Sequence, residues 1–483
     1  MGRWVKDKIK ALETQARRLE PAAGERVAWT KQVTAYAEHF LQSLPDAPTY
    51  VADDGASEQL DTAVEEGPAE LDALLGELAQ AVDTPGINAA SGGHLGYIPG
   101  GGLYPSALGD FLADVANRYA GVAFASPGAV RLEKALVDWM ARLVGYPAGA
   151  GGDLTSGGSI ANLTALVTAR EAQGIKARQI PQSTIYLTGQ AHHCVDKALR
   201  VAGLGECPRR LVPMDGRYRM DAQALERMID ADDKAGFRPW LVVASAGTTD
   251  TGAIDPLAAI GEICRRHKLW FHLDAAYGGF FRLCEEGRAV LGGMGQADSI
   301  VMDPHKGLFL PYGSGALLVR DVHQLARAHS YEANYMQDAR AAAADYSPAD
   351  LSTELSRPFR GLRLWLPLKL FGLGAFRAAL AEKIWLARYF HQRLGALAGF
   401  EVGPEPDLSV VTYRYRPARG DADEFNRRLL KTILEDGKVF VSSTRLDGAF
   451  TLRLAVLHYR THLDTVDYLL DLLQSSARHL EAN

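Results

Sequence analysis

The pattern of apolar and polar positions changes along the chain, and this change predicts the architecture. Between about residues 96 and 375, short runs rich in β-branched residues alternate with helical segments. The expected strands are STIYLTG (183–189), WLVVASAG (240–247), LWFHLDAA (269–276) and DSIVMD (298–303). Strands that alternate with helices form crossover units, so we expect a largely parallel sheet with helices on both faces.

The two flanking regions follow other patterns. Residues 1 to about 95 are mostly helical, with a Pro/Asp/Gly-rich connector at 44–61. From about 376, a helix leads into a strand, a further helix and a hairpin that is expected to turn at Asp447–Gly448. We therefore predict an N-terminal helical region, a large α/β domain and a small α+β domain, with the bounds 1–95, 96–375 and 376–483.

One helix start is well marked. Asp255 can cap a helix, and Pro256 fits the first turn of that helix. Leu257, Ile260 and Cys264 then fall on one stripe, which is typical of a helix that covers a core.

Composition and charge narrow the class of protein. The chain has 483 residues, a formal charge of −6 and a pI near 6.1, which argues against a nucleic-acid partner because phosphate binding needs a basic face. Its four cysteines show no CxxC spacing, so we expect reduced thiols and a cytoplasmic location. The N-terminus is amphipathic, unlike a signal peptide, and we expect no membrane-spanning run.

Polar residues at the ends of the predicted strands are the candidates for chemistry, since ligands of parallel sheets bind beyond the carboxyl ends of the strands. In TSGGSIANLTAL, Gly157 and Gly158 open a helix, and its free N–H groups and the Ser159 hydroxyl could bind an anion. The same residues are equally suited to a structural cap. Thr248 and Thr249 follow another strand, where a plain turn is the alternative.

A carboxylate and a lysine complete the pattern. Asp274 ends an apolar strand, where a carboxylate is costly unless a cation or a donor meets it. Lys306 lies one strand further on, and a partly desolvated lysine has a lowered pKa and attacks carbonyl groups. An anion cradle, a carboxylate for a pyridinium nitrogen and a lysine for an aldehyde are together what pyridoxal 5′-phosphate requires.

Four segments carry a resemblance to a known family: AHHCVDKAL, FHLDAAYGG, DSIVMDPHKG and RPFRGLRLW. They resemble the group II pyridoxal-phosphate-dependent amino-acid decarboxylases, which implies fold type I, with an aspartate aminotransferase-like large domain, and a homodimer with interface active sites. The resemblance implies that Lys306 forms the Schiff base, Asp274 pairs with the pyridinium nitrogen, and Ala276 and His192 cover the two ring faces. It also implies that Gly158, Ser159 and Thr248 hold the phosphate, with His305 close by.

A tyrosine is the expected proton donor to the carbon that loses carbon dioxide. The family has such a tyrosine in a loop, and in SYEANYMQDARAAAADYS the resemblance favours Tyr335 over Tyr346. A proton donor directs the reaction to an amine; without it, dioxygen gives an aldehyde, as in related aldehyde synthases. The family usually has Trp after His-Lys, whereas this chain has Gly307.

Other functions need weighing. A metal site would use His192, His193 and Cys194, but no second cluster of ligands is present. A serine hydrolase could use Ser159, Asp274 and His305 in that order, although this leaves Lys306 unexplained. A silent homologue that only binds cofactor or a partner is the third alternative.

The resemblance implies that the substrate is an L-amino acid, and two further segments bear on its side chain. By resemblance, GYIPGGG and NRYAGVAFASPG line the side-chain pocket, with contacts expected from Tyr97, Ile98 and Pro99. Arg118 is the one cation in these segments, so a second substrate carboxylate has no obvious partner. An aromatic or bulky apolar side chain is therefore favoured.

Overall fold

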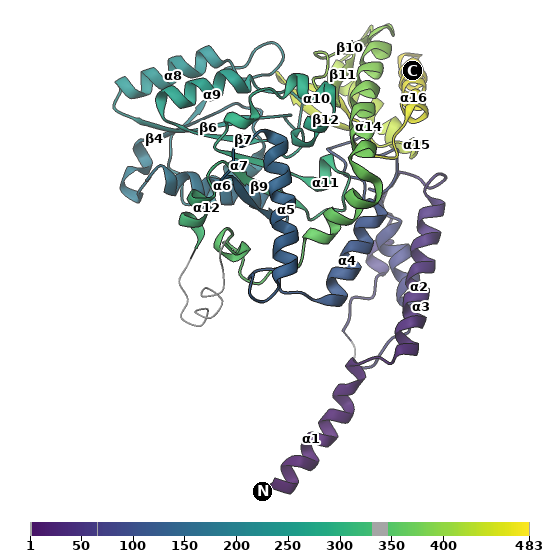
Figure 1. The fold of residues 1–483 in the computed structure, drawn as a ribbon. Coiled ribbons are helices and arrows are strands. Elements are labelled where there is room, and N and C mark those ends of the chain that lie inside the picture. The colour runs from purple at the N-terminus through teal and green to yellow at the C-terminus, as the bar shows by residue number, and fades with distance from the viewer. Residues whose placement is uncertain (1, 65, 331–345, 483) are drawn as a thin grey trace. The chain divides into compact units, whose positions relative to one another are not determined.

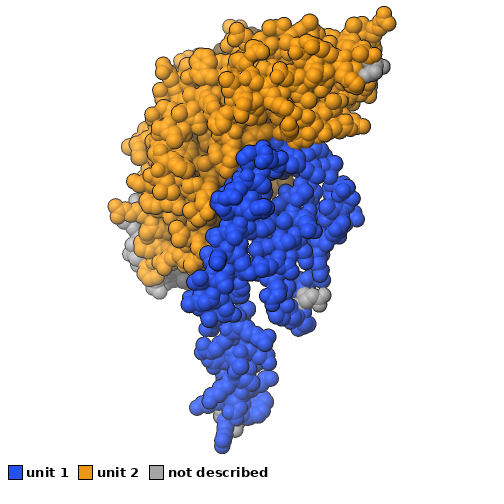
Figure 2. All heavy atoms as spheres, turned by 90° about the vertical axis from the view of Figure 1, so that its right-hand side faces the viewer, with its two compact units in different colours: residues 1–91 blue, residues 92–483 orange. Residues whose placement is uncertain are grey.

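The computed structural model describes residues 2–64, 66–330 and 346–482, and the chain forms two compact units, residues 1–91 and 92–483 (Figure 2). In the first unit, neither α1 from Arg3 onward nor α2 buries a residue, as expected for a region that cannot bury its apolar stripes alone. Its helices and strands are α1 (Gly2–Ala16), α2 (Ala23–Ser43), β1 (Tyr50–Val51), α3 (Leu71–Leu78) and β2 (Gly86–Ile87).

A seven-stranded sheet forms the centre of the second unit (Figure 1), in the order β3-β9-β8-β7-β6-β4-β5. Its strands are β3 (Gly151–Thr155), β4 (Ser183–Leu187), β5 (Arg209–Leu211), β6 (Arg238–Ser245), β7 (Trp270–Asp274), β8 (Ser299–Met302) and β9 (Gly315–Val319). The pairs β5–β4, β4–β6, β6–β7 and β7–β8 are parallel, whereas β9 pairs antiparallel with both β8 and β3. The predicted strands and the largely parallel sheet are confirmed.

Helices cover both faces of this sheet (Figure 1). Because side chains alternate along a strand, Val242 joins one core while its neighbours Leu241 and Val243 join the other. The first core includes α5 (Pro127–Val144), α8 (Ala222–Lys234) and α9 (Leu257–His267). The second includes α6 (Gly158–Ala172), α7 (His193–Val201) and α12 (Val322–His329).

A four-stranded antiparallel sheet with its own core follows, in the order β10-β11-β13-β12. The predicted hairpin is confirmed: Leu446 pairs with Ala449, and both Asp447 and Gly448 between them have positive φ. The elements are β10 (Phe400–Val402), β11 (Val410–Tyr415), α15 (Ala422–Asp436), β12 (Ser442–Leu446), β13 (Ala449–Ala455) and α16 (Leu463–Ala482). The division of the second unit near residue 376 stays a prediction.

The predicted cap at Asp255 is wrong. Helix α9 begins at Leu257 after Pro256, and no side chain caps it. The Asp255 carboxylate instead accepts hydrogen bonds from the N–H groups of Met220 (2.7 Å) and Ser245 (2.8 Å). It therefore joins two neighbouring segments rather than starting a helix, and burial raises its pKa to about 6.

Helix α14 (Gly361–Gly395) departs from the expectation that no segment is long and apolar enough to span a membrane. By length and composition alone, this is the one helix in the described part of the chain that could cross a membrane. Its backbone is not helical at Gly372, however, and Leu386 and Phe390 in its second half join the core of the smaller sheet. Helix α4 (Tyr104–Ala116), which comes much earlier in the chain, packs against α14.

A buried ion cluster holds the RPFRG segment in place. The Arg357 guanidinium lies 2.8 Å from Glu133 on α5 and also binds Asp153 on β3, and its side chain is fully buried. It donates a further hydrogen bond to the Leu154 carbonyl (3.1 Å). Burial raises the pKa of Glu133 to about 7, against the pull of Arg357, so these carboxylates depend on the guanidinium.

Replacement of this arginine tests the cluster. Arg357→Met should lower the free energy of unfolding by about 3–5 kcal/mol, because two buried carboxylates lose their cation. Arg416→Met, which breaks the exposed pair with Glu401, is the matched control and should cost about 1 kcal/mol at most. Urea unfolding measures both, and equal losses in the two variants would contradict the argument.

Candidate active site

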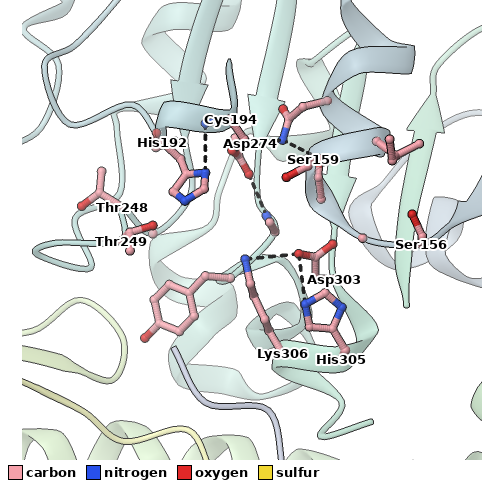
Figure 3. Close-up of a pocket in the computed structure, with 18 of the residues that line it drawn as sticks. Ser156, Ser159, His192, Cys194, Thr248, Thr249, Asp274, Asp303, His305 and Lys306 are labelled. Carbon is pink, nitrogen blue, oxygen red and sulfur yellow. Dashed lines mark hydrogen bonds and ion pairs between the residues drawn. The ribbon is translucent and has the colours of Figure 1, made fainter. Parts of the chain in front are cut away.

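A cavity of about 260 Å³ lies at the carboxyl ends of the central strands, and the labelled side chains of Figure 3 surround it. It brings together every residue predicted to bind a cofactor: Gly158, Ser159, His192, Thr248, Asp274, Ala276, His305 and Lys306. These residues come from five separate segments of the chain. Their convergence is the main structural support for one shared site.

The N-terminus of α6 forms one wall. The first N–H groups of a helix have no acceptor within it, and Gly158 and Ser159 supply the first two here. A Cβ atom on Gly158 would lie 2.8 Å from the Asp303 carboxylate, so only glycine allows this approach. A helix start of this kind is suited to an anionic group such as a phosphate.

Lys306 lies on the short helix α11 (Pro304–Gly307), between β8 and β9 as predicted. Its Nζ atom is 3.2 Å from Asp303 Oδ2 (Figure 3). Asp303 is almost fully buried, and its Oδ1 atom has no partner among the described residues. The sequence segment contained this aspartate, but nothing in it indicated that the side chain would face the lysine.

The expectation of a lowered Lys306 pKa is wrong for this state of the protein. Burial does lower that pKa, but the carboxylates of Asp303 and Asp274 outweigh burial and raise it. Burial also raises the pKa of Asp303, against the pull of Lys306. The carboxylates of Asp303 and Asp274 therefore stabilise the charged form of Lys306 in this cavity.

Asp274 and His192 both line the cavity, and Figure 3 shows them near one another on the side away from Lys306. Asp274 Oδ1 accepts from the Ala276 N–H (3.1 Å), and Oδ2 accepts from Asn162 Nδ2 (3.4 Å). His192 caps α7, where its Nδ1 atom accepts from the Cys194 N–H (3.3 Å). Burial lowers the pKa of His192, which favours a neutral, flat ring on the cavity wall.

The side chains of two further predicted residues, Thr248 and His305, form hydrogen bonds within the protein. The Thr248 hydroxyl lies 2.8 Å from that of Thr251 and accepts from the Ala253 N–H (3.2 Å). His305 Nδ1 donates to the Ser314 carbonyl, and its Nε2 atom is 3.6 Å from Asp303. The carboxylate beside His305 is thus Asp303, not the Asp274 that a hydrolase triad would use.

Gly307, which departs from the family pattern, has its space filled by another side chain. A Cβ atom at Gly307 would lie 2.8 Å from the Cβ atom of Phe280, which is fully buried. Phe280 also stacks on Trp139 with ring centroids 6.4 Å apart. The floor beside Lys306 is therefore packed by an aromatic ring from a different segment.

The residues predicted to contact substrate do not line this cavity. Tyr97 has an exposed side chain and a positive φ, Ile98 packs against the first core, and Pro99 is buried. Gly100 lies against the His305 carbonyl, since a Cβ atom there would come within 2.2 Å of it. The segment is therefore adjacent to the lysine helix, but the cavity does not include its side chains.

Arg453 on β13 is a residue that the sequence did not indicate. It is buried, and it donates to the carbonyl groups of Tyr97 (3.0 Å), Thr249 and Asp250 (3.2 Å) and to the Ser442 hydroxyl (2.8 Å). One guanidinium thus ties the smaller sheet to the loop after β6, which lines the cavity through Thr249, and to the loop that contains Tyr97. No local spacing could have predicted contacts that span 200 residues or more.

The two candidate tyrosines are only partly placed. Tyr335 lies outside the described residues. Tyr346 is described: its hydroxyl lies 2.9 Å from His323 Nδ1, and it does not line the cavity of Lys306. The structure adds no support for a metal site, because the described residues contain no cluster of potential metal ligands.

The residues present fit pyridoxal 5′-phosphate. The helix start at Gly158–Ser159 suits its phosphate, Asp274 suits a ring nitrogen that carries a proton, and Lys306 suits its aldehyde. His192 and Ala276 supply a flat ring and a small side chain for the space between. Asp303 alone is unfavourable for a phosphate, and its pairing with Lys306 reduces this repulsion.

Comparisons with known proteins identify the family of this chain. Residues 54–416 match the family model described as the pyridoxal-dependent decarboxylase conserved domain. An aromatic-L-amino-acid decarboxylase from Bacillus atrophaeus is 35% identical over 372 residues, which cover 76% of this chain and 77% of that protein. A phenylacetaldehyde synthase from Arabidopsis thaliana is 30% identical over 375 residues, 73% of this chain and 76% of that protein.

Among solved structures, that of Oryza sativa TDC with PLP and tryptamine has a TM-score of 0.90 at 26% identity. The match covers 95% of this chain and 99% of that one. The predicted fold type I architecture is thereby confirmed.

Neutralising Asp303 tests its effect on the lysine. Asp303→Asn keeps the shape but removes a charge that raises the Lys306 pKa, so that pKa should fall. The neutral amine, which reacts with the cofactor aldehyde, then exists at lower pH. The pH profile for cofactor uptake by cofactor-free enzyme should therefore move to lower pH.

Stopped-flow absorbance measures the uptake rate. Asp321→Asn, at the start of α12 and outside the cavity, is the control. An identical pH profile for Asp303→Asn and wild type would show that this carboxylate does not raise the pKa of Lys306.

Proposed function

The chain belongs to the pyridoxal-dependent decarboxylase family, and from this premise we propose that it converts an aromatic L-amino acid to the corresponding amine and carbon dioxide. The chain is a pyridoxal-phosphate-dependent amino-acid decarboxylase, a carboxy-lyase. The choice of an aromatic substrate is our proposal. The observation that carries the proposed roles is the presence of Lys306, Asp274, His192 and the start of α6 in one cavity.

Each of these groups has a role that follows from its position. When bound, the cofactor supplies an aldehyde for the substrate amine and a ring that accepts the electron pair left by carbon dioxide. Lys306 would hold the aldehyde of the cofactor, and Asp274 would keep a proton on its ring nitrogen and so maintain the positive charge there. The helix start at Gly158 and the ring of His192 fix the orientation of the ring plane.

The charges of the cavity argue against an acidic side chain on the substrate. Of the described residues that line it, Lys306 is the one cation of the Lys/Arg type, and it is paired with Asp303. Arg118, the cation noted in the sequence, lies 3.3 Å from the Ser126 hydroxyl instead. A second carboxylate on the substrate would be left without a partner, which is costly away from water. The relative from Bacillus atrophaeus is named for aromatic amino acids.

The competing outcome is an aldehyde, as the name of the Arabidopsis thaliana relative indicates for that protein. We favour the amine because the sequence has a tyrosine at position 335, the expected proton donor. A donor that reaches the reacting carbon first leaves no carbanion for dioxygen.

We further propose that the protein is a cytoplasmic homodimer with active sites at the subunit interface. Helix α4 of the second unit exposes Phe111, Leu112 and Val115 on its surface, and the first unit buries few apolar side chains. Apolar surface of this kind is suited to a second copy of the chain. All four cysteines are free and buried, which suits a reducing compartment.

The substrate proposal is tested by an assay of purified protein with each amino acid. Carbon dioxide release should be fastest with aromatic side chains, and kcat/KM for glutamate should be lower by roughly 100-fold or more. Amine should equal carbon dioxide, without peroxide. Lys306→Ala should release neither, whereas Lys134→Ala, on the exposed surface of α5, should match wild type. Peroxide in proportion to carbon dioxide would support the aldehyde route, and a preference for glutamate would refute the substrate class.

Sedimentation tests the dimer. At micromolar concentration the mass should be twice 52.3 kDa, and Leu112→Asp on α4 should shift it toward the monomer with loss of activity. Leu211→Asp, at an equally exposed apolar residue on β5, is the control. An active monomer would contradict both the dimer and the interface site.

A further inference from the structure

Strand β7 directs three side chains toward α6. Trp270, His272 and Asp274 are alternate residues, so they leave the same face of the sheet. Asp274 reaches the cavity, whereas Trp270 and His272 lie behind it, 6% and 0% exposed. Asn162 on α6 and Ser299 on β8 complete this group, and both are fully buried.

A continuous chain of hydrogen bonds connects these five residues. Trp270 Nε1 lies 2.9 Å from Ser299 Oγ, which is 2.8 Å from His272 Nδ1. His272 Nε2 is 2.7 Å from Asn162 Oδ1, and Asn162 Nδ2 is 3.4 Å from Asp274 Oδ2. The chain therefore runs from a buried indole to the carboxylate in the cavity.

The direction of every bond in this chain is fixed from both ends. An indole N–H only donates, so Ser299 Oγ accepts from it and donates its own proton to His272 Nδ1. His272 then carries its hydrogen on Nε2 and donates it to Asn162. A flipped Asn162 amide would turn its oxygen toward the Gly158 carbonyl (2.9 Å), so the amide NH₂ must face Gly158 and Asp274. Burial lowers the pKa of His272 to about 4, which agrees with a neutral ring.

We propose that Asn162 and His272 are positioning residues that hold the carboxylate of Asp274 oriented toward the ring nitrogen of the cofactor. This proposal rests on the role proposed above for Asp274. The two oxygens of Asp274 are held separately, Oδ1 by the Ala276 N–H and Oδ2 by Asn162. Donated hydrogen bonds favour an ionised carboxylate, and a buried chain with all donors directed one way cannot reverse without leaving a group unpaired.

The experiment uses holoenzyme that carries cofactor labelled with ¹⁵N at the ring nitrogen. In wild type the NMR shift should be that of a protonated nitrogen. In Asn162→Leu and His272→Phe it should move toward the unprotonated value. In both, kcat should fall roughly 10-fold or more while KM changes little, since the lost interaction acts after binding. His272→Gln can still accept from Ser299 and donate to Asn162, so it should restore much of the shift and the rate.

Tyr186→Phe is the matched control for a purely structural loss. Tyr186 is fully buried, and its hydroxyl donates to Asp232 Oδ2 (2.6 Å) outside the cavity. This variant should lose stability and keep the wild-type ¹⁵N shift. If Asn162→Leu and His272→Phe behave in the same way, the proposal is overturned.

Two further measurements keep the result interpretable. Asp274→Asn should give the unprotonated shift; if it does not, the role of Asp274 itself fails, which is a different result from failure of the chain behind it. If the two variants do not fold, selective ¹⁵N labelling of histidine in wild type decides the matter. A neutral Nε2–H tautomer for His272 supports the proposal, and an Nδ1–H or doubly protonated ring overturns it.

Discussion

The ammonium of Lys306 and the carboxylate of Asp303 are 3.2 Å apart where Asp303 is almost fully buried, and neither charge could be held there without the other. Most of the site can be derived from this constraint. The short helix that carries Lys306 starts at Pro304, directly after Asp303, so the pair is separated by only three residues and needs no distant support. Gly158 must lack a side chain for the start of α6 to approach the same carboxylate. A lysine that is charged at rest is thereby kept next to the position of the aldehyde.

The positions of the site residues were predictable because they follow from strands. Apolar runs identify strands, parallel strands end at one edge, and Asp274 and Lys306 follow two such ends. Contacts across elements were not predictable in this way. The partner of Lys306 depends on the direction of one side chain, and Asp255 bonds two N–H groups rather than capping the helix beside it. Tyr97 is held by Arg453, which is 356 residues away, and no local pattern encodes that.

The smaller sheet helps to hold a loop that lines the cavity. Arg453 reaches from β13 to the carbonyl groups of Thr249 and Asp250 on one side and of Tyr97 on the other. A buried guanidinium bonded only to neutral oxygens is costly to desolvate, so each of these bonds matters to its retention. Displacement of β13 would therefore move both loops together, so the position of Thr249 in the cavity wall depends on the packing of a separate sheet.

The contact between Gly307 and Phe280 has a consequence for how such chains diverge. The benzyl group of Phe280 takes the room that a side chain at 307 would need, and its stacking on Trp139 leaves it little freedom to withdraw. Because the closest contact is to the Cβ atom of Phe280, a side chain at 307 needs a shift of the backbone in one of the two segments as well as a change in the side chain at 280. The two positions are therefore sterically coupled, and a substitution at one of them should be tolerated only together with a change at the other.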